Sequence, residues 1–186
     1  MDRRSVQLYD LSGHPEYAAC VGEIVAVWSK IELRLSLLFS LLLRAPPWTA
    51  WAAWFSLFNS KARQDMMRAL VAELQAELPE KAEPISIINR VAKAPTARHG
   101  YAHKPWLLVG EKVYQLDLPA MPLEASRKHH ISLNMLQRDR DALRKLEADL
   151  NEFVQRFGNT YPMLLDWHLT RQSAPWPGRF TARPER

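Results

Sequence analysis

The chain of 186 residues is 47% hydrophobic and has a net charge of +5, with 25 Lys and Arg against 20 Asp and Glu. This length and composition predict one domain with its own hydrophobic core, and the modest positive charge permits an acidic partner such as nucleic acid without requiring one. The single cysteine, Cys20, excludes an intramolecular disulfide and a cysteine-based zinc cluster. It is typical of a reducing compartment, so we expect a cytoplasmic location.

The apolar segments are too short to predict a membrane protein. The most apolar one, residues 33–43, contains Arg34, whereas a membrane span needs about 20 consecutive apolar residues. No apolar run follows Arg3 and Arg4 near the N-terminus, so we also expect no secretory signal.

The first long helix is predicted over residues 15–43, beginning at Pro15. Apolar side chains recur in steps of three and four residues, which places them on one face: Val21, Ile24, Val25, Trp28, Ile31, Leu35, Leu38, Phe39 and Leu42. Glu32 lies beside this stripe. We interpret it either as a solvated flanking residue or as the partner of a buried cation such as Arg98.

A second helix is predicted over residues 48–78, between Pro47 and Pro79. Its first half spreads aromatic side chains around the helix: Trp48, Trp51, Trp54, Phe55 and Phe58. Such a segment is buried either in the core or in a subunit interface, and we expect a homodimer. In the second half we expect Met66, Leu70, Leu74 and Leu78 to face inward and Lys61, Arg63, Arg68 and Glu73 to face outward.

The third helix is predicted to start at Pro84 and to bury Ile85, Ile87, Ile88 and Val91. Because Pro95 cannot continue a regular helix, we expect a kink or a break between residues 93 and 96. Residues 81–104 hold five cations against the single acid Glu83, a local excess that would attract phosphate: Lys81, Arg90, Lys93, Arg98 and Lys104.

The rest of the chain completes an all-α fold, a bundle of four main helices with a small β-hairpin insertion. Two apolar runs around Gly110 predict the hairpin over residues 106–116, and a basic link then leads to the last helix, capped by Ser132 and stopped at Gly158. We therefore assign residues 1–158 to the helical domain. Residues 159–186 form an extension with one more short helix at 161–170 and a disordered Pro/Arg-rich end.

One dense polar motif runs from Thr96 to Trp106, and its centre reads Arg98-His99-Gly100-Tyr101-Ala102-His103. A fixed cation and a side chain that titrates near neutral pH stand close together there, which suits phosphate chemistry. An Arg followed by a polar residue and then by a His, at the end of a helix in an all-helical bundle, resembles the signature of the HEPN superfamily.

This resemblance implies a metal-independent endoribonuclease, in which His103 transfers protons, Arg98 stabilises charge on phosphorus, and two copies of the motif share a cleft in a dimer. His99 would orient this pair or bind phosphate, Tyr101 and Trp106 would stack on bases, and the cations Arg90, Lys93 and Lys104 would hold the RNA backbone. The toxin branch of the family has a Tyr two residues after the His. Here that position is Pro105, so the modification chemistry attached to that Tyr is not expected.

Alternatives remain open for this motif. Arg98 and His103 could cap a helix in a catalytically silent module that binds RNA or a protein, including a regulatory partner in a defence or toxin system. No cofactor or metal is expected, because His99 and His103 have the spacing of a ligand pair but no Cys, Asp or Glu nearby in the sequence to complete a site.

Overall fold

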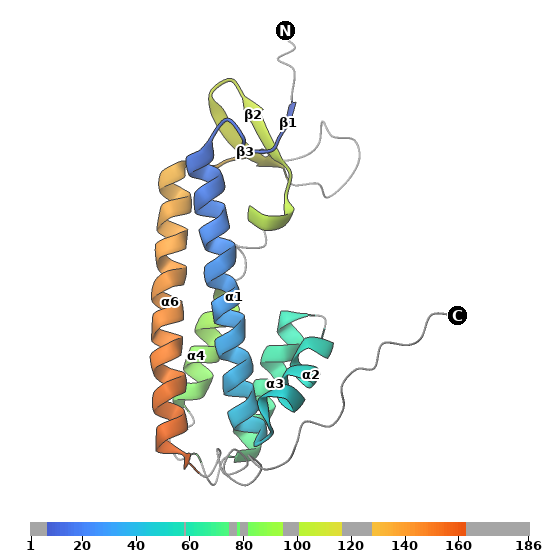
Figure 1. The fold of residues 1–186 in the computed structure, drawn as a ribbon, viewed down its shortest axis with the longest axis vertical. Coiled ribbons are helices and arrows are strands. Elements are labelled where there is room, and N and C mark those ends of the chain that lie inside the picture. Colours follow the sequence, from blue (N-terminus) through green and yellow to red (C-terminus); the bar gives the residue numbers. More distant parts are fainter. Residues whose placement is uncertain are drawn as a thin grey trace, which may run out of the picture.

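The computed structural model describes residues 7–57, 59–74, 78, 82–94, 101–116 and 128–162. It is an elongated helical bundle with a small antiparallel sheet at one end (Figure 1). The prediction of an all-α fold with a small β insertion is confirmed. The described helices are α1 (Pro15–Leu43), α2 (Pro47–Ser56), α3 (Ser60–Glu73), α4 (Ala82–Lys93) and α6 (Leu133–Thr160), and the strands are β1 (Gln7–Tyr9), β2 (Trp106–Val109), β3 (Lys112–Leu116) and β4 (Lys128–His130).

Helices α1 and α6 form the long axis of the bundle and run parallel to each other (Figure 1). Fully buried apolar residues recur every seven positions on α1, at Ile24, Ile31 and Leu38, and a similar series on α6 includes Leu136 and Leu150. A seven-residue repeat keeps one face of each helix turned toward the other over many turns. Ion pairs continue this contact on the surface.

The predicted ends of these two helices agree closely with the structure. Helix α1 begins at Pro15 and ends at Leu43, where Arg44 adopts a left-handed conformation with φ of 52° and donates its N–H to the last turn. Ser132 caps α6, because its hydroxyl accepts a hydrogen bond from the N–H of Met135 at 3.2 Å. Helix α6 continues past the predicted stop at Gly158 to Thr160.

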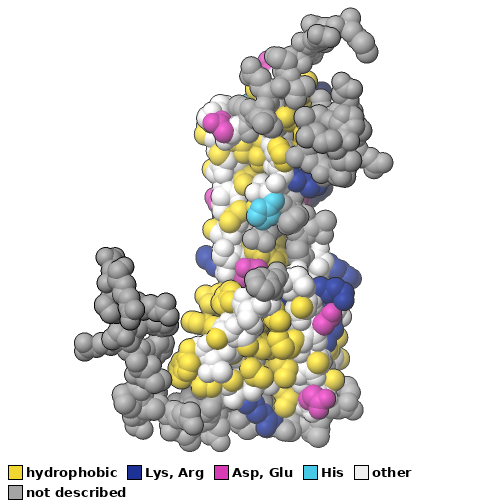
Figure 2. Space-filling model, turned by 90° about the vertical axis from the view of Figure 1, so that its right-hand side faces the viewer, with side chains coloured by type: hydrophobic (Ala, Val, Ile, Leu, Met, Phe, Trp, Pro, Cys, Tyr) yellow, Lys and Arg dark blue, Asp and Glu magenta, His cyan; other side chains and the backbone are white. Residues whose placement is uncertain are grey.

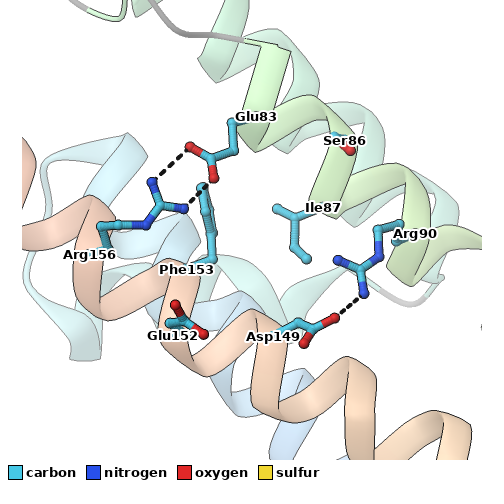
Figure 3. A pocket seen from close by; sticks show the side chains of 8 residues that line it. All are labelled: Glu83, Ser86, Ile87, Arg90, Asp149, Glu152, Phe153 and Arg156. Atoms are coloured by element: carbon cyan, nitrogen blue, oxygen red, sulfur yellow. Dashed lines mark hydrogen bonds and ion pairs between the residues drawn. The ribbon is translucent and has the colours of Figure 1, made fainter.

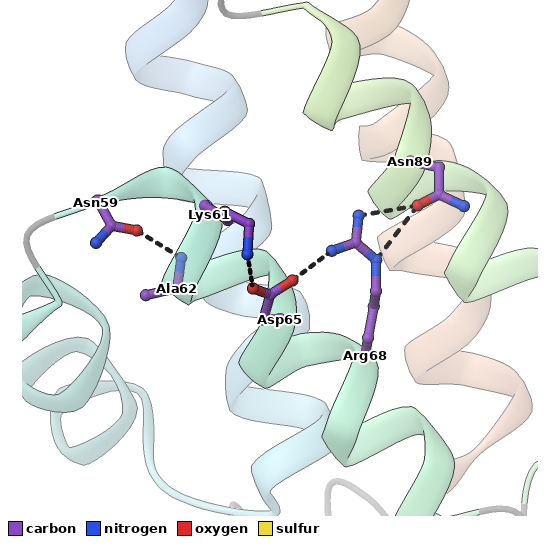
Figure 4. Close-up of polar contacts among 6 residues, drawn as sticks. All are labelled: Asn59, Lys61, Ala62, Asp65, Arg68 and Asn89. Atoms are coloured by element: carbon purple, nitrogen blue, oxygen red, sulfur yellow. Dashed lines mark hydrogen bonds and ion pairs between the residues drawn. The ribbon is translucent and has the colours of Figure 1, made fainter.

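The single second helix predicted over residues 48–78 is wrong. Helix α2 ends at Ser56, Leu57 is extended, and Asn59 starts α3 as a cap whose side chain accepts a hydrogen bond from the N–H of Ala62 at 2.6 Å (Figure 4). A side-chain acceptor at this position satisfies an N–H that the first turn of a helix leaves free, so Asn59 favours a new start over continuation.

This break changes which side chains of α3 face the core. Met67 and Val71 are buried, whereas the predicted inward residues Met66, Leu70 and Leu74 are only partly buried. Leu78 is buried as predicted, although α3 ends before it. Arg63, predicted to face outward, turns toward α1 and α2. Phe58 lies outside the described residues.

Helix α4 packs between α3 and α6. It starts near the predicted Pro84 and buries Ile87, Ile88 and Val91, while Ile85 is only partly buried. The guanidinium of Arg68 on α3 donates two hydrogen bonds to the side-chain oxygen of Asn89 on α4, at 3.3 and 2.9 Å (Figure 4). The helix ends at Lys93, before Pro95, and residues 95–100 lie outside the described part of the chain.

The sheet contains the predicted hairpin, with Gly110 at a φ of 63° in its turn, a conformation that glycine adopts without strain. Two further strands, which the sequence analysis did not predict, extend the hairpin to the order β1-β2-β3-β4. Strand β1 pairs with β2, with Tyr9 opposite Trp106, and β4 pairs with β3, with His130 opposite Tyr114.

Among the described residues, no helix combines the length and the apolar composition that a membrane crossing needs. The short helix predicted at residues 161–170 and the disorder predicted beyond residue 172 fall almost entirely outside the described part of the chain.

Candidate functional site

The described part of the polar motif begins at Tyr101. Tyr101–His103 form a helical turn that leads directly into β2, whereas Arg98 and His99 lie outside the described residues. The predicted pairing of Arg98 with His103, the orienting role of His99 and the contact of Glu32 with Arg98 therefore stay predictions.

Tyr101 fixes this turn to helix α6. Its side chain is only 4% exposed, and its hydroxyl donates a hydrogen bond to the Asp139 carboxylate at 2.6 Å. Burial and the neighbouring carboxylate raise the pKa of Tyr101 far above its usual value, so the phenol stays neutral and keeps its donor. A ring buried in this way does not support the base-stacking role predicted for Tyr101.

His103 lies on the outer side of the same turn. Successive helical residues are rotated by about 100°, so His103 faces roughly opposite to Tyr101, and its side chain is exposed. Lys104 and Trp106 follow and are each partly buried. The Trp106 ring stacks on Tyr101, with centroids 6.4 Å apart and planes at 19°, which leaves only part of its surface for a ligand.

A groove of about 480 Å³ lies between α4 and α6, and its lining includes two of the predicted RNA-binding cations. Arg90 and Lys93 of α4 line one wall, and Asp139, which holds Tyr101, lines the other. The apolar part of the lining includes Leu143 and Leu146. The fold thus brings Asp139, which holds Tyr101 of the motif, and the cations of α4 to one amphipathic groove.

A second hollow of about 260 Å³ continues along the same two helices (Figure 3). Two ion pairs span it. Arg156 donates to both carboxylate oxygens of Glu83, and Arg90 donates to Asp149. The hydrogen bond from Arg156 lowers the pKa of Glu83. Arg90 lines both hollows, so the cation predicted to contact phosphate is already paired with an acid of this chain.

Glu32 has a partner that the sequence analysis did not assign to it. Its carboxylate lies 3.6 Å from the guanidinium of Arg63, and the two side chains are 30% and 16% exposed. Arg63 also donates to the backbone oxygens of Trp54 and Leu57, both at 3.1 Å, and lies over the ring of Phe55. Arg63 therefore holds the turn between α2 and α3.

Asp139 and Asp149 are the site residues that the sequence reasoning missed. Neither belongs to the buried face of α6, and an acidic residue on the polar face of a helix usually indicates only exposure to solvent. Their partners, Tyr101 and Arg90, are far away in the chain, and no local pattern links them.

Within the part of the chain that the structure describes, no group of three or more His, Cys, Asp and Glu residues could hold a metal ion. Comparisons with models of known protein families, with curated proteins and with solved structures gave no match.

Proposed function

We propose that this chain is a HEPN-like endoribonuclease that cuts single-stranded RNA without a metal ion, using Arg98 and His103. One observation supports the proposal most. The turn that carries the exposed His103 is tied through Tyr101 to Asp139, and Asp139 lines the groove that also contains Arg90 and Lys93. The turn that carries His103 is thus fixed to the wall of a groove that is lined by Arg90 and Lys93 and is of a size for a nucleotide.

The chemistry would be transesterification by the 2′-hydroxyl of RNA. A base takes the proton of this hydroxyl, its oxygen bonds to the adjacent phosphorus, and the bond to the 5′-oxygen breaks as that oxygen receives a proton. We assign proton transfer to His103 and stabilisation of the charge on the phosphoryl oxygens to Arg98. The products are a 2′,3′-cyclic phosphate and a free 5′-hydroxyl.

The groove suggests how the strand is held. Lys93 is exposed at its rim, where it can pair with a backbone phosphate, and the floor formed by Leu143 and Leu146 can take an unstacked base. We assign further contacts with the strand to Lys104 and Trp106, which follow His103 in the chain and are each partly buried. Tyr101 positions the turn and does not itself contact RNA.

The alternative is a catalytically silent module that binds RNA or a protein in the same groove. It is favoured by the charge balance of the walls, because Asp149 neutralises Arg90 and Asp139 faces Lys93 across the groove. Such a balance weakens the attraction for phosphate, which dominates nucleic-acid affinity.

The test is cleavage of a labelled single-stranded RNA by purified protein in EDTA, with a DNA of the same sequence as the negative substrate. We expect RNA to be cut to 2′,3′-cyclic phosphate ends and DNA to stay intact, since DNA lacks the attacking hydroxyl. His103→Ala should abolish cutting, and Arg98→Lys should retain a small fraction of it because an ammonium lacks the planar fork of a guanidinium. His130→Ala, an exposed histidine on β4, is the matched control and should cut normally.

Two outcomes would contradict the mechanism. Cutting that requires Mg²⁺, or that survives in His103→Ala, would exclude this pair of residues. RNA binding without cutting, weakened by Lys93→Ala, would favour the silent module.

A further inference from the structure

Helix α2 is apolar both on its inner face and on part of its solvent-exposed side. Its inner face buries Ala50 and Trp54 in the core, at 0% and 1% exposure. Its outer face presents Trp48, Trp51 and Phe55, which are 54%, 37% and 56% exposed. Figure 2 shows hydrophobic side chains gathered over the lower half of this side of the molecule. A surface helix with large aromatic side chains on its solvent face points to an interaction surface.

The outer face has a regular shape. Trp48, Trp51 and Phe55 follow each other at steps of three and four residues and form one ridge along the helix. A second exposed row, formed by Thr49, Ala52 and Ser56, repeats the same steps with small side chains. Because each residue turns by about 100°, the small row lies about 100° around the helix from the ridge. A row of large side chains therefore borders a shallow row of small ones, on the side facing away from the core.

Helix α2 contributes no charged side chain to this surface, since its ten residues include no Asp, Glu, Lys or Arg. Apolar area continues at the adjoining end of α1, where Leu43 is 36% exposed. Aromatic side chains offer roughly 150–250 Å² each, so three that are about half exposed leave on the order of 300 Å² uncovered. With Leu43 and the small row the face reaches roughly 500 Å², and two such faces would bury about 1,000 Å², the lower bound for a specific interface.

We propose that a second copy of this chain docks on the outer face of α2, with the two α2 helices parallel. A two-fold interface must fit itself, because both subunits contribute the same surface. When the symmetry axis runs along the helices, the ridge of one copy lies over the small row of the other. An antiparallel arrangement would instead place ridge against ridge. Since α2 has no charge, bringing the two helices together in register costs no like-charge repulsion.

The position of this interface separates it from the groove. Helix α2 packs on α1 on one side of the bundle, whereas the groove opens between α4 and α6 on the other side (Figure 1). This dimer therefore leaves the two grooves apart and does not form the shared cleft that the HEPN resemblance implies. The proposal is independent of catalysis, and each subunit has to contain a complete site if the protein cuts RNA.

The first test measures the molar mass of the full chain by size-exclusion chromatography with light scattering, from about 1 to 100 µM. We expect a dimer, and we expect Trp48→Glu and Trp51→Glu each to give a folded monomer, because a carboxylate buried in this apolar interface opposes association. Ala148→Glu, an exposed alanine on α6, adds the same charge elsewhere and should remain dimeric. Circular dichroism confirms that the variants are folded.

Two results would overturn the interface. One is a wild-type monomer over the whole concentration range, and the other is a dimer that persists in both glutamate variants. A wild-type monomer that co-floats with anionic phospholipid vesicles, while Trp51→Glu does not, would assign the face to a lipid surface instead.

The second test decides the orientation, by pulsed electron spin resonance on a spin label at Glu111→Cys in the exposed hairpin turn. Helix α1 has 29 residues, or roughly 44 Å at 1.5 Å per residue, and α2 lies at the end remote from the sheet (Figure 1). Parallel docking keeps the two labels at the same end, so we expect a distance below about 50 Å. A distance above about 60 Å would overturn the parallel arrangement.

Discussion

Replacing Tyr101 by Phe isolates the contact that ties the motif to the bundle. The substitution removes only the hydroxyl that donates to Asp139 and keeps the ring that packs near Trp106. Its consequence should therefore be the loss of one hydrogen bond to a carboxylate, with no cavity in the core. We expect a less stable protein and a less well positioned His103.

The size of the effect follows from the surroundings of Asp139. A hydrogen bond to a charged group contributes about 1.5–3 kcal/mol to the free energy of unfolding. The Asp139 side chain is 23% exposed, and Arg138 lies 3.8 Å away, so water and this arginine compensate part of the loss. We expect Tyr101→Phe to lower the free energy of unfolding by about 1.5 kcal/mol, near the lower end of this range.

The assay is urea unfolding followed by circular dichroism, completed as a double-mutant cycle with Asp139→Ala. The two substitutions should be coupled by about 1 kcal/mol, because each removes the same bond. Tyr114→Phe, a partly buried tyrosine in β3, is the matched control and should cost less than about 0.5 kcal/mol. If the protein is a ribonuclease, Tyr101→Phe should also slow cutting without abolishing it.

Additive effects of the two substitutions would contradict a direct hydrogen bond between Tyr101 and Asp139. So would a Tyr101→Phe protein as stable as the Tyr114→Phe control, because the anchor would then contribute nothing.

Two further predictions concern the scaffold. Arg63→Met should lower the free energy of unfolding by about 1–3 kcal/mol, since it removes the donor to two backbone oxygens at the end of α2. Lys61→Met, at an exposed position, is the control and should change the free energy of unfolding by less than about 0.5 kcal/mol. Equal effects of the two substitutions would contradict the role of Arg63. Glu83→Gln should flatten the acid side of the stability profile. The hydrogen bond from Arg156 lowers the pKa of Glu83 in the folded protein. The stability that this ion pair contributes is therefore present above the unfolded pKa of about 4.3 and is lost as the pH falls through the folded pKa. If urea unfolding of Glu83→Gln shows the same pH dependence as the wild type between about pH 3 and pH 6, this prediction is wrong.

The long helices and the hairpin could be predicted from the sequence because their signals are local. In α1, apolar side chains at steps of three and four residues predict one buried face, and Pro15 predicts the start. Ser132 predicts the start of α6 through a hydrogen bond within its own first turn. Gly110 predicts the hairpin turn through its backbone freedom. Each of these depends on residues that are close in the chain, so the residue pattern suffices.

The break between α2 and α3 shows where local signals compete. The aromatic run up to Phe55 and the helical pattern from Met66 favour one continuous helix, while Asn59 favours a new start. The structure resolves this competition with a long-range contact. Once α2 folds back on α1, Arg63 bonds the end of α2 and meets Glu32, which a continuous helix would not allow.

The candidate site depended on tertiary structure even more. The sequence indicated the basic character of α4 and the polar motif, but not that Tyr101 is buried against Asp139 or that Arg90 is already paired with Asp149. The outer face of α2 is likewise defined only by the tertiary structure, which buries Trp54 in the core and leaves Trp48, Trp51 and Phe55 exposed. Helical periodicity determines which side chains share a face. Only the docking of helices that are distant in the chain decides which face is covered and which charges meet, because those contacts form between surfaces and not between sequence neighbours.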